Sequence, residues 1–438
     1  MKVKGGSGIN ITADEPLIPG QHPMRHTHMN SNPAVLSNSA KYVVLVALVA
    51  AGIVGRLNNY KISPPTTNGI GRLRTSLHES NFVAKFEEAL DPEYKGPFVP
   101  LIINNDGKML CPKMEGGTSR RAQHFVRMLH VGLQTEHQRL WFTYGHVMNG
   151  HLPILLMGGD GNGCNLIKCE EGFDFPRLSW SMPSQQPNGS EWCHAIGIPS
   201  YELWKSFGKV NISNVIETHE HIYPWNRKIP KAVWRGSTTY DNEQYGNVSF
   251  HDIPRARLVQ ESKDRPDLID AAFTKIHQRF ENKAEELMPT TIMARRMPFD
   301  DQMKYKAIID IDGNNWSARY AKLLCSNSVV IKIVPDFVEY FYDELHPHVH
   351  YIPASLANIT DVASYVLDES NSSKMKAVVQ AANEWCERKM KGHRIAVDAI
   401  NQLDEYLHAL ADYGYKDNFH VKWKKLLGSE PFDDLVQC

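Results

Sequence analysis

Cysteine is scarce in this chain of 438 residues. The seven cysteines are too few for a fold built on disulfides, and no Cys-x-x-Cys pair of the kind that holds structural zinc occurs. Cys164, Cys169 and Cys193 lie close together in sequence and are candidates for one bridge in an oxidising compartment. Buried, inert thiols are the alternative. Because the count is odd, at least one cysteine is a free thiol or bonds another molecule.

An excess of basic residues is also missing. The formal net charge is -1, whereas proteins that bind nucleic acid usually carry a strong positive excess, so we expect no nucleic-acid partner. Hydrophobic residues make up 42% and charged residues 22% of the chain, which excludes a mainly disordered or collagen-like protein. The length allows two domains, at roughly 150 residues per domain.

Long hydrophobic runs are absent except for one short stretch. The uncharged run from Tyr42 to Gly55 is flanked by Lys41 and Arg56. It is shorter than the ~20 apolar residues that usually span a bilayer, and the polar segment before it is longer than the start of a usual signal peptide. We predict a disordered tail at 1–41, a signal anchor at 42–55 and a stem at 56–80. A cleaved signal and a soluble core helix are the alternatives.

Potential glycosylation sites follow the apolar run and fit a lumenal catalytic part. These Asn-x-Ser/Thr sequons lie at Asn188, Asn211, Asn247, Asn315, Asn358 and Asn371. The C-terminal sequence Asp-Leu-Val-Gln-Cys is not a retrieval signal of the KDEL type. We therefore expect a single-pass type II protein of the Golgi membrane, with the endoplasmic reticulum as the alternative.

Apolar strands alternate with helical segments in the second half of the chain. The segments KAVWRG, KAIIDIDG, SVVIKIV and VHYIP are typical of strands, and ARLVQES, ARYAKLLC, FVEYFYDEL and DVASYVLDE of helices. Such alternation predicts an α/β fold with parallel βαβ units in a doubly wound sheet. We predict a first domain at 81–224, a second at 225–395, and C-terminal helices at 396–438 that pack back on the first domain.

The segment from Lys306 to Lys332 carries the most informative pattern. Its strand ends at Asp310 to Gly313, and a helix is predicted to begin near Ser317 with Arg319 in its first turn. Free backbone N–H groups and the helix dipole favour a phosphate at such a junction, and Arg319 can add a bidentate bond. An ordinary strand-to-helix turn, capped by asparagine and serine, is the alternative.

A second segment, Trp234 to Ser237, ends another expected strand. Gly236 permits close backbone approach, and Ser237 can donate to a phosphate oxygen. Arg255 and Arg257 follow at the start of a helix, where one of them can neutralise a leaving diphosphate. Solvated surface arginines are the alternative.

A third segment places one acid among glycines. Asp160 lies in the sequence LLMGGDGNGCN after an apolar strand, where it can serve as a general base at the edge of a cleft. An aspartate that only shapes a turn is the alternative.

Together these segments resemble glycosyltransferase family 90, the family of the capsule xylosyltransferases and the Rumi-type protein O-glucosyltransferases. The likeness rests on YKAIIDIDGNNWSARYAKLLCSNSVVIK, on FVEYFYDELHPHVHYIPA, and on the elements AVWRGSTT and PRARL. It is strong from about Trp225 to Pro353 and looser from about Pro153 to Trp204.

The resemblance implies a GT-B fold, with two Rossmann-like domains facing a cleft and a UDP-sugar donor bound by the second. The residues it assigns to the nucleotide sugar are Ser237, Arg255, Asn314, Asn315, Trp316, Ser317, Ala318 and Arg319. Further possible contacts are Arg235, Gly236, Gly313 and Glu339. The family inverts the anomeric centre with a carboxylate base, for which Asp160 is the candidate and Asp174 the substitute, although the family's Arg-Asp-Tyr-Pro context is missing.

We accordingly expect transfer of glucose or xylose from a UDP-sugar to a hydroxyl of a protein or glycan. No cofactor is expected beyond the UDP-sugar co-substrate. Asp310 and Asp312 have the form of a metal-binding Asp-x-Asp pair, but they occupy the family's strand end, so we interpret them as structural and expect metal independence. Two alternatives remain: an inactive relative that binds glycans or proteins, and a soluble Rossmann-type enzyme with another nucleotide ligand.

Overall fold

The structure is a computed structural model that describes residues 81–91, 98–112, 117–145, 148–157, 175–184, 195–241, 245–416, 419–429 and 435–438. The predicted tail, anchor and stem lie outside these residues, as do Asp160, Asp174, Cys164, Cys169 and Cys193. No helix within the described ranges is long and apolar enough to cross a membrane. The described residues all belong to one contact unit, which begins at residue 75.

The first sheet is mixed, with the strand order β13-β2-β1-β3-β4-β6. Its strands are β1 (Phe98–Ile103), β2 (Met109–Cys111), β3 (Leu152–Met157), β4 (Arg177–Ser179), β6 (Ala195–Gly197) and β13 (Val436–Gln437). β3, β4 and β6 run parallel, whereas β1 pairs antiparallel with both β2 and β3. The sheet therefore departs from the all-parallel Rossmann-like pattern expected here. The β1–β2 hairpin has a local cause, because Gly107, with φ of 78°, turns the chain back after β1.

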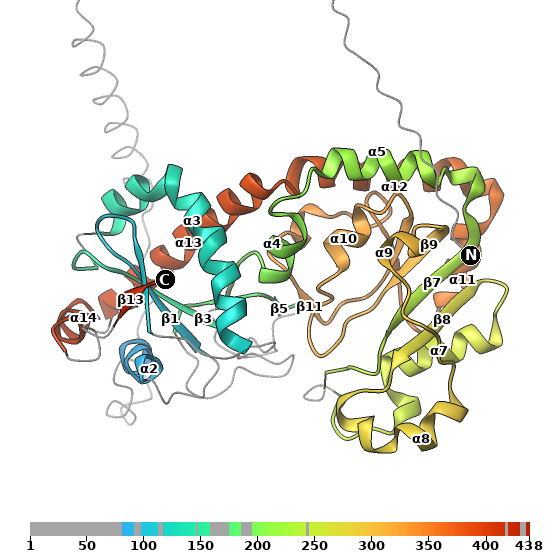
Figure 1. The fold of residues 1–438 in the computed structure, drawn as a ribbon, viewed down its shortest axis with the longest axis horizontal. Helices are drawn as coiled ribbons and strands as arrows, with labels where there is room; N and C mark the ends of the chain where they lie inside the picture. The colour runs from blue at the N-terminus through green and yellow to red at the C-terminus, as the bar shows by residue number, and fades with distance from the viewer. Residues whose placement is uncertain are drawn as a thin grey trace, which may run out of the picture. The chain divides into compact units, whose positions relative to one another are not determined.

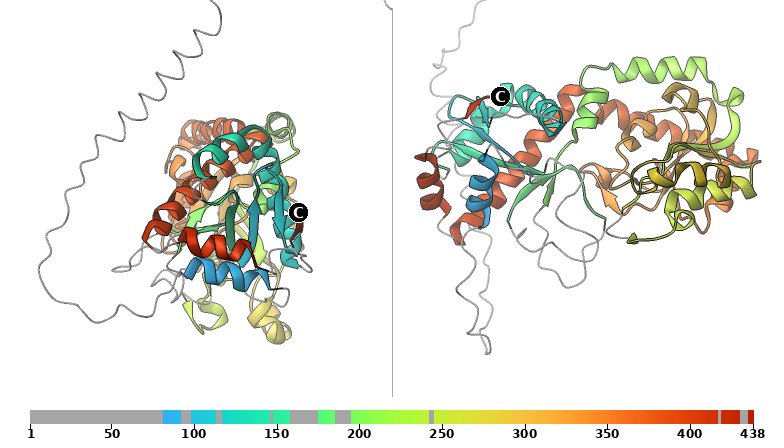
Figure 2. Two further views of the ribbon diagram at one scale, coloured as in Figure 1. Left: turned by 90° about the vertical axis from the view of Figure 1, so that its left-hand side faces the viewer. Right: turned by 60° about the horizontal axis from the view of Figure 1, so that its bottom comes forward.

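Helices from both ends of the chain cover this sheet (Figures 1 and 2). They are α2 (Asn81–Leu90), α3 (Gly117–Tyr144), α13 (Gly392–Lys416) and α14 (Phe419–Leu427). α13 lies along α3 and α14 packs against α2. Gly132 of α3 allows the close approach, because a Cβ there would stand 2.5 Å from the side chain of Ile400. A Cys111–Cys438 disulfide fastens the C-terminus beside β2.

The second sheet is fully parallel, with the order β12-β10-β9-β7-β8. Its strands are β7 (Ile229–Ser237), β8 (Ile269–Lys275), β9 (Tyr305–Asp310), β10 (Val329–Ile333) and β12 (Ile352–Ala354). The expected α/β fold with parallel strands is confirmed. Counted in chain order, the strands are arranged 2-1-3-4-5, so the winding direction changes between β7 and β9. Ligands of doubly wound sheets bind at the carboxyl ends of the strands at this switch point.

Alternate side chains of these strands enter two different cores, as buried parallel strands require. Trp234 and Ile309 pack in one core with α7 (Pro254–Asp264) and α11 (Ile359–Leu367). Val233 and Ile308 enter the other with α10 (Tyr320–Leu324), and α12 (Ser372–Lys389) contributes to both. A second disulfide, Cys325–Cys386, joins the end of α10 to α12.

Two predicted helices differ from the structure. α10 begins at Tyr320, so Arg319 is its N-cap and does not lie in its first turn. The segment FVEYFYDEL is not an α-helix: it forms β11 (Phe337–Val338) and a 3₁₀ turn, Tyr342–Glu344. Burial explains this, because Phe337, Glu339 and Phe341 alternate as buried residues, which is the period of an extended chain.

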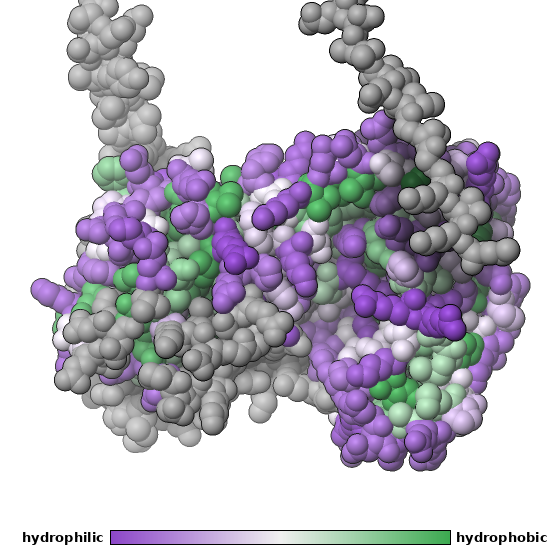
Figure 3. Space-filling model, viewed as in Figure 1, coloured by the Kyte–Doolittle hydropathy of each residue, from purple (hydrophilic) through white to green (hydrophobic). Residues whose placement is uncertain are grey.

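β11 links the two sheets. It pairs antiparallel with β5 (Met182–Pro183), and the backbone N–H of Ser184 donates to Asp336 O at 2.9 Å. In Figure 1 the pair lies between the first sheet and α10. The remaining helices are α4 (Tyr201–Phe207), α5 (Ile212–Ile222), α8 (Ala284–Leu287) and α9 (Phe299–Gln302). Figure 3 shows a mainly hydrophilic surface on this side, with a smaller hydrophobic area between α7 and α8.

Candidate active site

Three segments meet at the carboxyl ends of β7 and β9. They are the end of β7 from Trp234 to Ser237, the first turn of α7 and the stretch from Asp310 to Arg319. All three were singled out from sequence, and the switch point of the second sheet places them together.

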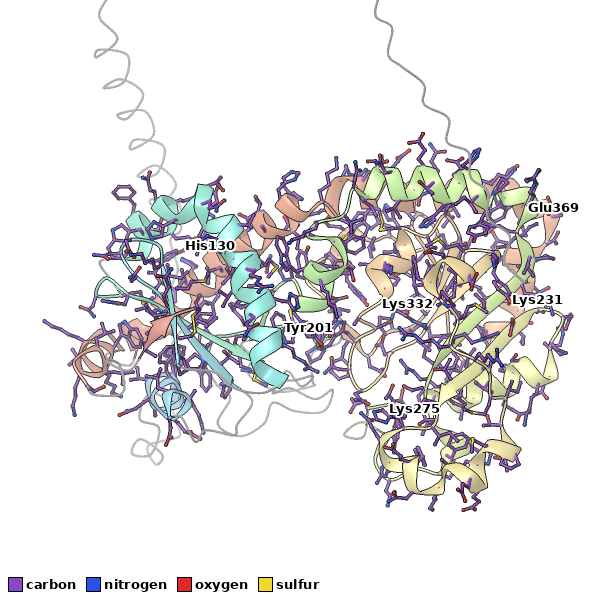
Figure 4. The ribbon with its side chains drawn as sticks, viewed as in Figure 1. His130, Tyr201, Lys231, Lys275, Lys332 and Glu369 are labelled. Carbon is purple, nitrogen blue, oxygen red and sulfur yellow. A yellow bond between two sulfur atoms is a disulfide. The ribbon has the colours of Figure 1, made fainter. Side chains whose placement is uncertain are left out.

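A buried ion cluster fixes the end of β9. Asp310 is fully buried and accepts hydrogen bonds from Ser317 Oγ at 2.6 Å and from Lys332 Nζ at 2.8 Å. Lys332, labelled in Figure 4, also contacts Asp312 Oδ1 at 2.8 Å. Burial alone would raise the pKa of Asp310, but Lys332 and Arg319 outweigh it and hold the pKa below its usual value. Asp310 is therefore an anion whose oxygens already bind protein groups.

Both carboxylate oxygens of Asp312 also bind protein groups. Its Oδ2 accepts from the backbone N–H groups of Asp336 and Phe337, at 3.1 and 3.4 Å. This joins the loop after β10 to the end of β9. In this structure Asp310 and Asp312 fix the end of β9 against Ser317, Lys332 and the loop after β10.

Arg319 lies beside this cluster. Its Nη1 donates to the backbone oxygen of Arg235 at 2.8 Å, and its Nε lies 3.5 Å from Asp310 Oδ1. The guanidinium lies over the indole of Trp234, 5.9 Å from the ring centroid. Because α10 is only five residues long and begins after Arg319, the positive charge here comes from the side chain rather than from a helix dipole.

Arg255 reaches the same place from the first turn of α7. It donates from Nε to Asp312 O at 2.9 Å, and from Nη1 to Ser237 O at 3.1 Å and Thr239 Oγ1 at 2.5 Å. Burial, followed by the nearby Arg319, lowers the pKa of Arg255 to about 10. Both guanidiniums thus remain charged at neutral pH and concentrate positive charge at the strand ends.

Gly313 leaves the space that Arg255 occupies. A Cβ at this position would stand 3.1 Å from Arg255 Nη2 and 3.3 Å from Thr239 Oγ1. Both distances are tighter than ordinary van der Waals contacts, so a side chain here would displace the arginine.

A pocket opens next to the arginines. Its walls come from the loops after β7, β9 and β10 and from the start of α7, and the residues lining it are Tyr240, Asp241, Tyr245, Pro254, Ile311, Asp312, Gly313, Asn315, Ile333, Val334, Asp336, Phe337 and Leu356. Aromatic and aliphatic side chains thus face three carboxylates and one amide. Tyr245 donates its hydroxyl to Asp336 Oδ2 at 3.1 Å, and burial raises the pKa of Tyr245, so the phenol keeps its proton.

Asn315 connects the pocket to the first sheet. Its amide oxygen accepts from Ser181 Oγ at 2.5 Å and from the backbone N–H of Trp316 at 2.9 Å. Its side chain is buried to all but 7%, and its amide nitrogen donates to no residue that the structure describes. This nitrogen is available to a ligand in the pocket.

The other residues assigned to the nucleotide sugar have varied surroundings. Ser237 ends β7, and its hydroxyl bonds to no described residue. Trp316 is buried in the core, and the Oδ1 of Asn314 is a buried acceptor without a partner among the described residues. The hydroxyl of Ser317 donates to Asp310, and Ala318 is exposed.

Of the residues assigned to the nucleotide sugar or named as further contacts, only Gly313 and Asn315 line the pocket, and Arg235, Gly236 and Glu339 are bound elsewhere. The guanidinium of Arg235 turns to Asp270 at 2.8 Å on β8, and Gly236 packs against the ring of Trp234. Glu339 is buried and accepts from Ser200 Oγ at 3.2 Å. Burial, with a smaller contribution from Glu202, raises the pKa of Glu339 well above its usual value.

Sequence reasoning missed Tyr240, Asp241, Tyr245 and Asp336. Asp336 comes three residues after β10 and was detectable, because polar residues at the carboxyl ends of parallel strands share one edge of the sheet. The other three follow β7 on a loop whose path no local pattern fixes. Asp160 follows the end of β3 by three residues but, like Asp174, lies outside the described residues.

Comparison with known proteins adds an independent finding. The model of the family described as "Glycosyl transferase family 90" matches residues 178–418, which is more than half of the chain. The matched region contains β7 to β12 with Arg235, Arg255 and Arg319, and it begins after Asp160 and Asp174.

Curated proteins are also similar to part of this chain. Protein O-glucosyltransferase 2 of Danio rerio is 29% identical over 282 residues, which cover 60% of this chain and 51% of that protein. Protein O-glucosyltransferase 1 of Mus musculus is 30% identical over 42% of this chain and 43% of that protein. O-glucosyltransferase rumi of Drosophila pseudoobscura pseudoobscura is 30% identical over 45% and 42%. The chain thus spans about half the length of the curated relatives it matches.

Proposed function

Because this chain belongs to glycosyl transferase family 90, we propose that it transfers a sugar from a UDP-sugar donor to a hydroxyl group of a protein. The observation that carries the proposal is the pair of guanidiniums, Arg255 and Arg319, at the switch point of the parallel sheet. The relatives' names motivate the protein acceptor, and a glycan acceptor is an alternative substrate.

The diphosphate of the donor would lie against the two arginines. Guanidinium groups form strong charge-assisted hydrogen bonds to phosphate. The attraction is stronger at a partly buried site than in bulk water, because the effective dielectric constant is lower there. The bonds from Arg255 to Asp312 O and Ser237 O fix its orientation before a ligand arrives. A preorganised positive charge of this kind stabilises the diphosphate that develops as the donor bond breaks.

The nucleoside half of the donor would occupy the adjacent pocket. Its apolar walls, Ile333 and Phe337 among them, suit the face of a base. An ionised carboxylate accepts hydrogen bonds and donates none. Asp241 and Asp336 therefore suit the hydroxyl groups of a ribose, which can donate. The amide nitrogen of Asn315 can donate to a base carbonyl or a phosphate oxygen.

The reaction would be a single displacement with inversion. The Asp160 carboxylate takes the proton of the acceptor hydroxyl, whose oxygen attacks the anomeric carbon while the bond from that carbon to UDP breaks. UDP leaves with its negative charge facing Arg255 and Arg319. Asp174 is the substitute base. Since Asp310 and Asp312 already bind Lys332 and backbone groups, we propose that the arginines, without a metal ion, neutralise the leaving group.

The larger architecture would be of the GT-B type. The doubly wound second sheet supplies the donor site, and the first sheet, with β3 leading toward Asp160, supplies the acceptor side. Asn315–Ser181 and β5–β11 join the two.

We further propose a lumenal site of action, with residues 42–55 as the anchor of a Golgi protein. The two described disulfides, Cys111–Cys438 and Cys325–Cys386, support this, because disulfides persist in oxidising compartments. The transferred sugar is proposed to be glucose or xylose, which differ by one hydroxymethyl group.

A UDP-release assay tests the proposal. The full chain would be incubated with UDP-glucose, UDP-xylose or GDP-mannose, with and without a protein acceptor, beside Asp160→Asn and Asp174→Asn. We expect release from one UDP-sugar and its loss in Asp160→Asn. UDP binding without release from any donor would instead support the inactive, binding relative. Full activity in Asp160→Asn would assign the base to another residue.

A further inference from the structure

The Asn-Val-Ser sequon at position 247 lies on a firmly held loop. The backbone oxygen of Gly246 accepts from Tyr240 Oη at 3.3 Å and from Arg279 Nη1 at 2.9 Å. Phe250, three residues further on, is buried in the core. The backbone on both sides of Asn247 is therefore fixed, whereas Asn247 itself is exposed. We infer that Asn247 carries an N-linked glycan in the folded protein, an inference that rests on the proposed lumenal placement.

The space around Asn247 fits a bulky substituent. Its side-chain amide bonds to no residue that the structure describes. Gly246 has φ of 63°, and no atom lies within 4 Å of the position that a Cβ would take there. Asn247 also lies outside the pocket lining, although Tyr245 belongs to it. A glycan would thus leave the chain beside the pocket and break no described contact.

Other sequons within the described residues are less suited. Asn315 is buried, and its amide oxygen holds Ser181, so the folded chain has no room for a glycan there. The amide nitrogen of Asn371 donates to Tyr365 O at 3.0 Å. Asn211 and Asn358 are exposed, but their amide oxygens cap α5 and hold Ser355. Of the described sequons, only the one at Asn247 has both amide atoms unengaged.

The chemistry is a group transfer in which the Nδ2 of Asn247 is the nucleophile. A bond forms between Nδ2 and the anomeric carbon of an oligosaccharide, and the bond from that carbon to a lipid diphosphate breaks. Nδ2 loses one proton, and the lipid diphosphate is the leaving group. The host cell's glycosylation machinery supplies this lipid-linked oligosaccharide in the lumen, where sequons are modified.

Site occupancy in the full chain tests the inference. The chain with its own N-terminus would be expressed in eukaryotic cells, deglycosylated with an amidase in ¹⁸O water and mapped by mass spectrometry. We expect ¹⁸O-labelled aspartate at position 247 and unmodified asparagine at position 315. Asn247→Gln should migrate faster on a gel by one glycan, while its rate of UDP release stays that of the wild type.

Alkylation of the same sample without reductant measures the redox state of Cys325 and Cys386. This measurement distinguishes a failure of the Asn247 site from a failure of the lumenal placement. If Cys325 and Cys386 are protected from alkylation by their disulfide and Asn247 is unmodified, the glycosylation site is wrong and the lumenal placement still holds. Alkylated cysteines with no glycan at any sequon would overturn both. A modified Asn315 in soluble, folded protein would contradict the argument from burial. None of these outcomes depends on transferase activity.

Discussion

The guanidiniums of Arg255 and Arg319 lie over the same indole, 5.6 and 5.9 Å from the centroid of the Trp234 ring. One comes from the first turn of α7 and the other from the N-cap of α10, and each also binds backbone oxygens at the strand ends. Two like charges at one place repel each other, and this repulsion by Arg319 adds to burial, the larger cause, in lowering the pKa of Arg255. A bound diphosphate would relieve this repulsion, so the site should be more stable with its ligand than without it.

Gly313→Ala should weaken donor binding more than it weakens the fold. The added methyl group would stand 3.1 Å from Arg255 Nη2 and force the guanidinium to move. We expect the KM for the UDP-sugar to rise about tenfold, which corresponds to ~1.4 kcal/mol. Gly428→Ala is the matched control, since its Cβ would meet its nearest neighbour at 3.7 Å. Equal KM values in the two variants would show that the position of Arg255 does not affect binding of the UDP-sugar.

Lys332→Met should destabilise the protein strongly. It leaves the buried carboxylates of Asp310 and Asp312 without their shared cation, a change that typically costs ~3–5 kcal/mol. Lys275→Met, on the exposed Lys275–Glu281 pair, should cost less than ~1 kcal/mol. Denaturant unfolding at pH 7 measures both. A loss of similar size in the two variants would contradict the role given to the ion cluster.

Lys228 should make stability rise with pH. Its Nζ is buried and donates to Met303 O and Ser328 Oγ, and burial lowers its pKa to about 7. The unfolded chain binds this proton up to pH ~10.4, so between these values the unfolded state holds more protons and the free energy of unfolding increases with pH.

Unfolding curves at pH 7, 8 and 9 for wild type and Lys228→Met isolate this contribution. The difference in free energy of unfolding should grow toward alkaline pH, by up to ~1.4 kcal/mol per pH unit. A difference that stays constant over this range would mean that Lys228 titrates normally.

Cys325→Ala/Cys386→Ala should lower both stability and donor affinity. The bridge closes a loop of 61 residues, and the loss of such a bridge typically costs ~2–5 kcal/mol. It also ties α10, which follows Arg319, to α12. Thermal unfolding and UDP titration of the oxidised protein measure the two effects. If unfolding were unchanged, the bridge would not stabilise the native chain.

The parallel strands of the second sheet were predictable from sequence because central strands buried on both faces appear as continuous apolar runs. KAVWRG, KAIIDIDG and SVVIKIV became β7, β9 and β10, and the polar residues after them met at one edge. C-terminal helices packing back on the first domain were predicted, but the pairing of Cys111 with Cys438, 327 residues away, was not, because no local pattern specifies which two cysteines meet.

Side-chain direction was the weaker part of the sequence analysis. Arg235 neighbours Trp234 in sequence, yet strand alternation turns it to the other face, toward Asp270. Asp310 and Asp312 had the form of metal ligands, and only the tertiary position of Lys332 showed which groups they bind. The loop of Tyr240 and Tyr245 carries no periodic signal, so its contribution to the pocket could not be foreseen.

Titration calorimetry of UDP tests the central claim most directly, with wild type, Arg319→Ala and Arg257→Ala compared. Arg257 is the matched control, because it is exposed on α7 two residues beyond Arg255 and, unlike Arg255 and Arg319, bonds to none of the described strand-end groups. The account predicts that UDP binds the wild type and Arg257→Ala alike. It predicts about 10- to 100-fold weaker binding by Arg319→Ala, as expected for the loss of a charge-assisted bond of ~1.5–3 kcal/mol. Equal binding by a folded Arg319→Ala variant would contradict it.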